Sequence, residues 1–137
     1  MLQREKIIPR GIRNNNPLNI RIGNTWLGER RNPTDNQFEE FDAMEYGYRA
    51  AFCILRRYIR RYHLDTVAKI ISTWAPASEN NTLKYIDTVC ASMNREPDAQ
   101  IDYADEETMV ALAEAMTRVE CGQSVDRDII VKGYRIA

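Results

Sequence analysis

The chain has 137 residues, of which 44% are hydrophobic and 28% are charged. This balance is typical of a globular domain with one core, and no run of about 18 apolar residues could cross a bilayer. The opening MLQREKIIPRG lacks the apolar stretch and the small-residue cleavage site of a secretory signal. We therefore expect a single domain over residues 1–137 that is made in the cytoplasm, with no membrane partner.

Charge is distributed unevenly along the chain. The net charge is −1, but residues 1–62 hold 12 basic and 7 acidic side chains, against 7 basic and 13 acidic in the rest. A basic first half can face any polyanion, including nucleic acid or the acidic bacterial wall. The three cysteines are an odd number without Cys-x-x-Cys pairs or histidine partners, so we expect free thiols and no metal.

Residues 11–41 alternate short apolar runs with turn-forming residues. Leu18-Asn19-Ile20-Arg21-Ile22 follows Asn14-Asn15-Asn16-Pro17 and precedes Gly23-Asn24, and Phe38-Glu39-Glu40-Phe41 comes later. Fragments of period two between Asn, Gly and Pro predict an irregular β-hairpin lobe.

The first three predicted helices follow this lobe. A long helix runs from Asp42, whose spacing to Glu45 resembles a capping box, to about Tyr62. Asp65 can cap a shorter helix that ends at Trp74, before Pro76. Asn80 or Asn81 opens a third, with its apolar face at Leu83, Ile86, Val89, Cys90 and Met93, and Asn94 and Pro97 close it.

Two further helices complete the helical lobe, residues 42–137. Asp105-Glu106-Glu107 begins a fourth helix that runs to Cys121, with Gly122 suited to the left-handed terminating position. A last short helix occupies Asp126 to Lys132 and ends at Gly133. The sequence therefore predicts a mainly α (α+β) fold of about five helices with a small hairpin lobe.

Glu120 is unusual within the fourth helix. It follows Met116 by four residues and Ala113 by seven, so it shares the apolar face of Met109, Leu112 and Val119. It also lies in the last turn, where the helix dipole disfavours a carboxylate. Burial and dipole both raise the pKa of a carboxyl group, as a general acid for glycosidic bond cleavage requires. The alternative is a solvated charge paired with Arg118 or Arg127.

The segment Arg10 to Arg21 resembles the Arg-Asn-Asn-Asn-Pro-Gly-Asn-Ile-Arg signature of phage and prophage virion-associated lysozyme-like proteins. The rest of the pattern is similar in order: Trp26 with Gly28, Phe38-x-x-Phe41, Gly47-x-Arg49-Ala50, Trp74-Ala75-Pro76, Glu79-Asn80-x-Thr82 and Tyr85-Ile86. The likeness covers most of the chain, and it implies a peptidoglycan-cleaving glycosidase: a muramidase, glucosaminidase or lytic transglycosylase.

A second likeness concerns bacterial cell-wall glucosaminidases of the lysozyme superfamily. In them a helix ending Glu-Ser-Gly precedes an Asn-rich turn, whereas here the turn stands near the amino end and Glu120-Cys121-Gly122 near the carboxyl end. A circular permutation of a lysozyme-like fold explains both, and the termini of compact domains often lie close together. This resemblance implies that Glu120 is the catalytic acid and faces the turn 14–20 across a groove.

The resemblance also implies the rest of the site. A second carboxylate could come from the hairpin lobe, with Glu39 and Glu29 as candidates beside Asp35 and Glu40. Sugar rings stack on aromatic faces and hydrogen-bond to amides. The expected substrate-binding residues are therefore Asn14, Asn15, Asn16, Trp26, Trp74, Glu79, Asn80 and Tyr85. The reaction needs no cofactor, and the partners are peptidoglycan glycan strands together with virion or tail proteins.

Three alternatives remain. Leu18 stands where the family has glycine, and Cys121 where it has Asn or Ser, which is compatible with an inactive virion or tail protein of the same fold. Arg56, Arg57, Arg60 and Arg61 make a basic helix face that could bind nucleic acid, although no reading motif accompanies it. A Cys121–His63 hydrolase is disfavoured because His63, the single histidine, is far away in sequence.

Overall fold

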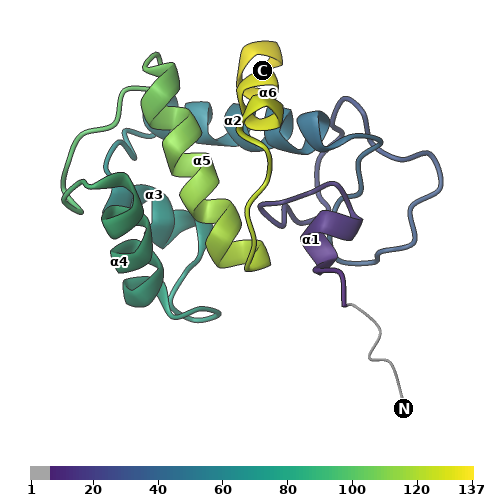
Figure 1. Ribbon diagram of the computed structural model, residues 1–137, viewed down its shortest axis with the longest axis horizontal. Coiled ribbons are helices and arrows are strands. Elements are labelled where there is room, and N and C mark those ends of the chain that lie inside the picture. Colours follow the sequence, from purple (N-terminus) through teal and green to yellow (C-terminus); the bar gives the residue numbers. More distant parts are fainter. Residues whose placement is uncertain (1–6) are drawn as a thin grey trace.

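The fold is mainly helical (Figure 1). The computed structural model describes residues 7–137; residues 1–6, where the sequence was expected to lack a secretory signal, lie outside them. The described helices are α1 (Arg10–Arg13), α2 (Met44–Arg61), α3 (Val67–Trp74), α4 (Thr82–Met93), α5 (Glu106–Cys121) and α6 (Arg127–Ile136). The five longer ones correspond to the predicted helices, and α1 is a short addition. No helix in this part of the chain is long and apolar enough to cross a membrane.

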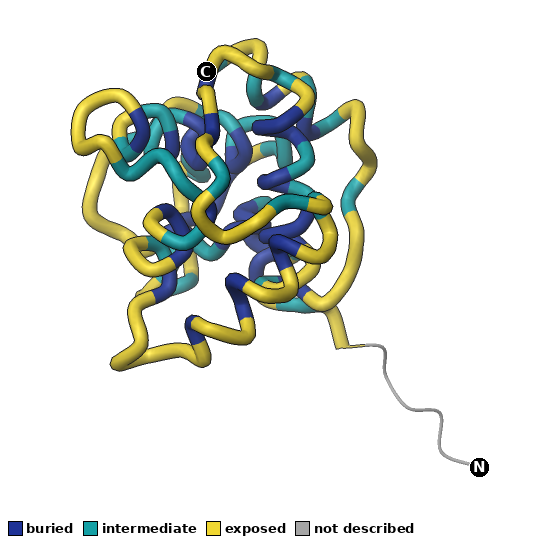
Figure 2. Tube along the Cα trace, turned by 90° about the vertical axis from the view of Figure 1, so that its left-hand side faces the viewer, coloured by how far each residue is buried: buried dark blue, intermediate teal, exposed yellow. Residues whose placement is uncertain are grey.

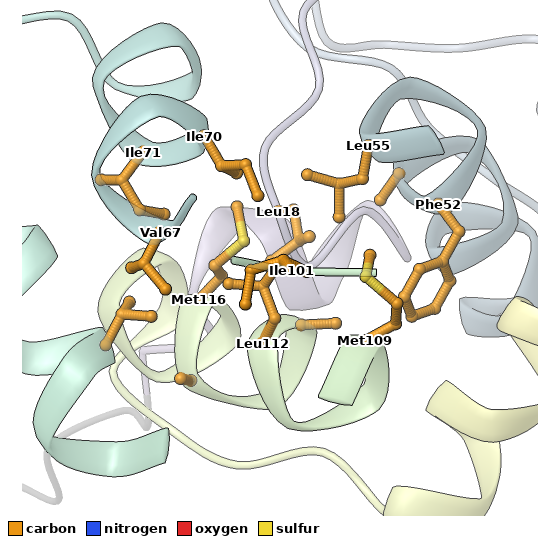
Figure 3. Close-up of a cluster of buried hydrophobic side chains, with 14 of the residues drawn as sticks. Leu18, Phe52, Leu55, Val67, Ile70, Ile71, Ile101, Met109, Leu112 and Met116 are labelled. Atoms are coloured by element: carbon orange, nitrogen blue, oxygen red, sulfur yellow. The ribbon is translucent and has the colours of Figure 1, made fainter. Parts of the chain in front are cut away.

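Helix α5 crosses the middle of the molecule and organises the packing. It contacts α4, α6 and α1, while α6 also lies along α2 (Figure 1). Figure 2 shows buried backbone concentrated inside and exposed backbone in the outer loops. Figure 3 shows Leu18, from the loop before α2, among side chains of α2, α3 and α5 such as Leu55, Ile70 and Met116. The loop region therefore shares one core with the helices.

Residues 11–41 do not form the predicted β-hairpin lobe. Residues 11–41 contain α1 but no strand, and their only ladder contacts within the described chain are the isolated antiparallel bridges Arg21–Phe38 and Glu29–Phe41. Side chains replace the ladder here: Asn16 donates to the carbonyls of Ile20 and Glu39 and accepts from the Ile20 N–H. Asn and Asp side chains that bond the main chain compete in this way with regular sheet.

Several helix boundaries also differ from the prediction. Thr66, not Asp65, caps α3, and α2 begins after Ala43 without a side-chain cap. Leu83 is 76% exposed, so it does not belong to the buried face of α4. Gly133 lies inside α6, where a Cβ would stand 2.4 Å from the Tyr48 Cβ. It permits close packing of α6 on α2 and does not end the helix.

Candidate functional site

Glu120 lies at the carboxyl end of α5 and holds a defined position. Helix α5 ends at Gly122 in the left-handed conformation, with φ of 68°. The Asn19 amide donates to Oε1 of Glu120 at 3.0 Å, and the Tyr85 hydroxyl donates to Oε2 at 2.9 Å. The side chain is only partly exposed. A carboxyl group near the end of the chain is therefore fixed by the amino-terminal loop and by α4.

The loop is tightly docked on this end of α5. The Cys121 thiol donates to the Pro17 carbonyl oxygen at 3.1 Å. A Cβ on Gly11 would stand 2.8 Å from the Asn19 Oδ1 and 2.9 Å from the Cys121 Sγ, so only glycine fits between them. Asn19 itself has a φ of 54°, a left-handed conformation that Asn tolerates better than most residues. These contacts hold the Asn19 amide against Glu120.

The pKa of Glu120 is raised above its ordinary value. Burial is the main cause, since it penalises the charged form, while the hydrogen bonds from Asn19 and Tyr85 act in the opposite direction. Burial and the charge of Glu120 also raise the pKa of Tyr85, so its phenol keeps the proton that it donates. Glu120 can therefore release a proton to a bound group. The resulting carboxylate is stabilised by the hydrogen bonds from Asn19 and Tyr85.

The two hydrogen-bond partners of Glu120 line two different hollows. The first, here called the α4–α5 hollow, has a volume of about 410 Å³ and is lined by Asn80, Asn81, Lys84, Tyr85, Thr88, Arg118 and Val119. The second, the loop–α3 hollow, has about 230 Å³ and is lined by Asn19, Ile20, Arg21, Asn24, Ile54, Tyr58 and Trp74. Glu120 itself lines neither hollow, but it is linked to the first through Tyr85 and to the second through Asn19.

The structure corrects the predicted substrate-binding role of the asparagine triplet, residues 14–16. Asn14 and Asn16 are completely buried, so they cannot touch a glycan. Asn14 donates to the Asp35 carboxylate, and Asn16 bonds main-chain groups of the loop. Asn15 is half-buried, and its amide donates to the Phe41 carbonyl oxygen. The triplet shapes the loop, and the amide that reaches the acid comes from Asn19, three residues further on.

Glu39 and Glu29 form a carboxyl pair in the loop region. Glu39 is buried, its Oε2 has no hydrogen-bond partner among the described residues, and its carboxyl lies within hydrogen-bonding reach of Glu29. Burial first, and then the neighbouring Glu29 carboxyl, raise the pKa of Glu39 to about 8. The Glu39 carboxyl therefore keeps its proton near neutral pH. Glu29 also accepts a hydrogen bond from the main-chain N–H of Trp26.

The other two loop carboxylates have structural partners. Asp35 accepts from the guanidinium of Arg10, which is the main reason that its pKa lies well below the usual range. Glu40 is buried and accepts from the main-chain N–H groups of Thr34 and Asp35 and from Arg30. Both tie distant parts of the loop together, so neither is free to act on a ligand.

The remaining predicted residues are distributed between the hollows. Trp74 lines the loop–α3 hollow with its ring edge-on to Tyr58, and Asn80 lines the α4–α5 hollow. Glu79 is exposed, with its carboxylate 3.9 Å from the Arg21 guanidinium. Trp26 is half-buried against the core, outside the lining of both hollows. Tyr85 is 5% exposed, so it contributes its hydroxyl rather than a stacking face.

The arginine-rich face of α2 is largely occupied by aromatic rings. Arg56 and Arg60 lie over the Tyr103 ring, and Arg57 and Arg61 lie near Tyr62. Such stacking anchors the guanidinium groups to the protein itself.

The structure also disfavours the alternative of a Cys121–His63 hydrolase. Burial raises the pKa of Cys121 to about 11 and leaves the thiol protonated at neutral pH.

Sequence reasoning missed Asn19 as a site residue. Its signal is present in the chain, because the residue follows a turn-forming Asn-Pro pair and Asn is the residue type, after glycine, that best tolerates a left-handed backbone. What the sequence did not reveal is that the turn would place this amide, 101 positions away, on the Glu120 carboxylate.

Fold and site together define a mainly helical protein in which a loop docks on a partly buried carboxylic acid, whose two hydrogen-bond donors line separate hollows. In comparison with known proteins, no family model matches the chain. It is 39% identical over 130 residues to Protein P5 of Pseudoalteromonas phage PM2, an alignment that spans 91% of this chain and 79% of that protein. The chain therefore belongs to the same family as this bacteriophage protein.

Proposed function

We propose that the protein is a lysozyme-like glycosidase that cleaves β-1,4 bonds between the amino sugars of peptidoglycan, with Glu120 as general acid. The observation that carries the proposal is the setting of Glu120, a partly buried carboxyl group that is held by Asn19 of the loop–α3 hollow and by Tyr85 of the α4–α5 hollow. Its raised pKa favours the protonated form that a general acid needs. The phage origin of Protein P5 is compatible with a virion-associated protein.

A circularly permuted lysozyme-like fold is part of the same proposal. In bacterial cell-wall glucosaminidases of the lysozyme superfamily, the helix ending in the acid comes before the Asn-rich turn. Here the turn comes first, and Asn19 precedes Glu120 by 101 positions, yet turn and helix are in direct contact through Asn19 and Glu120 and through Cys121 and Pro17. Leu18, in place of the usual glycine, is compatible with this arrangement. It has no positive φ, and its side chain fills the core.

The proposed chemistry starts with the glycan lying across Glu120, one sugar on each side. The Glu120 carboxyl donates its proton to the bridging oxygen as the bond from that oxygen to the anomeric carbon breaks. An oxocarbenium-like centre forms on one sugar, and the other leaves with a new hydroxyl group. The Asn19 amide and the Tyr85 hydroxyl stabilise the Glu120 carboxylate that remains.

The second half-reaction returns the proton. Glu120, now a base, accepts it from a water molecule or from a hydroxyl of the same sugar as that oxygen attacks the anomeric carbon. Water gives hydrolysis, and an intramolecular hydroxyl gives the anhydro end of a lytic transglycosylase. Glu29 or Glu39 is the candidate second carboxylate, and the N-acetyl group of the substrate can serve in its place.

The test is to incubate the purified protein with isolated peptidoglycan sacculi and to identify the released sugars by mass spectrometry. Glu120→Gln removes the acid while keeping the shape, and Glu107→Gln, at an exposed position near the start of α5, is the matched control. We expect release of muropeptides by the parent and Glu107→Gln proteins and none by Glu120→Gln. Sacculi left intact by the parent protein would favour the alternative of an inactive virion or tail protein.

A further inference from the structure

The α4–α5 hollow differs from the surrounding surface in charge. Two of its lining side chains, Lys84 and Arg118, are cationic, and none of its lining residues is acidic. Two other hollows contain acids: Asp65 and Asp102 line one beside Arg60, and Asp87 and Glu96 line one beside Arg95. The loop–α3 hollow also has no acid, but its lining holds a single cation, Arg21. Although Asp87 follows Lys84 by one helical turn, it lines the hollow of Arg95 and not the α4–α5 hollow.

Lys84 and Arg118 differ in the contacts that their charged groups make with the rest of the protein. Lys84 is exposed, and no carboxylate among residues 7–137 lies within ion-pair distance of its ammonium group. Arg118 is oriented by the hydroxyls of Ser92 and Ser124, both at 3.3 Å, and its contact with Glu114 is loose at 3.8 Å. Lys84 thus supplies an unpaired charge, and Arg118 supplies a guanidinium held in place at the rim.

The hollow is connected to the proposed catalytic acid through Tyr85. Tyr85 lines it and donates to Glu120, and Val119, the residue before Glu120, contributes an exposed apolar side chain. A sugar bound here would therefore be next to the acid. Its substituents would meet an apolar contact at Val119 and two positive charges at Lys84 and Arg118.

We propose that the α4–α5 hollow is a subsite for a sugar that bears an acidic substituent, whose carboxylate is bound by Lys84 and Arg118. This inference rests on the proposed function. In peptidoglycan the substituent is the lactyl-linked peptide, which carries free carboxylates, whereas an uncharged amino-sugar polymer offers none. The subsite therefore makes the protein selective for peptide-bearing glycan and fixes which sugar lies on the Tyr85 side of Glu120.

The experiment measures binding, so that it does not depend on cleavage. Full-length protein is co-sedimented with untreated sacculi and with sacculi whose carboxylates have been converted to methylamides. Lys84→Met removes the charge and keeps the chain length, and Lys132→Met, at an exposed position on α6, is the matched control. Arg118→Gln is the second variant, and the circular dichroism of each variant reports its folding.

We expect Lys84→Met to bind untreated sacculi about fivefold more weakly than the parent, which is the effect of losing one exposed ion pair. On methylamidated sacculi the two should bind equally, and Lys132→Met should match the parent on both. Equal binding of parent and Lys84→Met to untreated sacculi would overturn the subsite, as would a lack of binding by the parent. Charge-dependent binding without any cleavage would support the subsite and refute the glycosidase.

Discussion

Glu120 and Glu39 are both shielded carboxyl groups with a raised pKa, but their surroundings differ. Glu120, at the end of α5, has a hydrogen-bond donor on each oxygen and a partly open face. Glu39, in the loop region, is buried beside another carboxyl group and has an oxygen without a partner. The surroundings of Glu120 accommodate both the protonated and the ionised carboxyl, so a proton can leave and return. The surroundings of Glu39 mainly retain a proton.

The largest expected effect is on catalysis by Glu120. Glu120→Gln should lower the rate of glycan cleavage by about 10²–10⁴-fold, the range for loss of a general acid. Glu39→Gln should lower it far less, because glutamine resembles the protonated acid that the pair already holds near neutral pH. Initial rates of muropeptide release measure both variants. A larger loss for Glu39→Gln than for Glu120→Gln would reverse the roles of the two carboxyl groups.

The next effect contrasts Glu39 with Asp35, a loop carboxylate that does have donors. Asp35→Asn should reduce the free energy of unfolding by about 1–2 kcal/mol at pH 7, because it removes the charge of a shielded carboxylate that accepts from Arg10 and Asn14. Since the pKa of Asp35 is lowered in the folded protein, its contribution is present above the ordinary aspartate pKa and fades as the pH falls below it. Urea unfolding at pH 7 and pH 3 measures this, with Asp128→Asn on exposed α6 as control. A deficit that is undiminished at pH 3 would contradict the ionic origin.

Glu39 should show the opposite dependence on pH. Its pKa is raised to about 8 in the folded protein, so the folded state holds a proton that the unfolded state has lost. The stabilisation is therefore complete below about pH 4.5 and is lost as the pH rises through 8. Glu39→Gln should remove this loss and be about 1–2 kcal/mol more stable than the parent at pH 9, with little difference at pH 4. Thermal unfolding across this pH range tests it, and parallel curves for the two proteins would refute it.

The smallest effect concerns the two donors of Glu120. Tyr85→Phe and Asn19→Gly each remove a hydrogen bond that favours the ionised carboxylate, so each should raise the pKa of Glu120 further. Glycine suits position 19 because the φ there is 54°. The alkaline fall of the cleavage rate should then move to higher pH, at a lower maximal rate. Tyr58→Phe, at the loop–α3 hollow, is the control. A shift to lower pH would show that these donors do not act on the ionised form.

The helices were predictable because their signals are local. Asn81 and Asp105 lie at the starts of α4 and α5, and Asn94 and Gly122 end these helices, at the positions that the sequence indicated. The left-handed conformation was predicted for Gly122, and Asn94 adopts it as well. Glu120 could be found as a candidate because its spacing from Met116 and Ala113 places it on the apolar face of α5. A helix repeats every 3.6 residues whatever packs against it, so such a spacing can be read from the chain alone.

The loop region was predicted poorly because its structure depends on contacts distant in sequence. Asn14, Asn16 and Asp35 have the composition of a turn or a ligand-binding segment, yet they bond one another and the main chain. Nothing in the local pattern tells an internal amide from an exposed one. The same holds for Gly133, which was expected to end a helix and instead allows α6 to approach Tyr48.

The sequence by itself determined the helical class, most helix ends and the unusual position of Glu120, because propensity, capping and periodicity act within a few residues. Only the tertiary structure decided which donors reach that acid, that the Glu39 carboxyl is buried beside Glu29, and that Lys84 and Arg118 border the same hollow. These features join residues up to 101 positions apart. Packing of the loop and α4 against α5 creates them, and no local pattern records that packing.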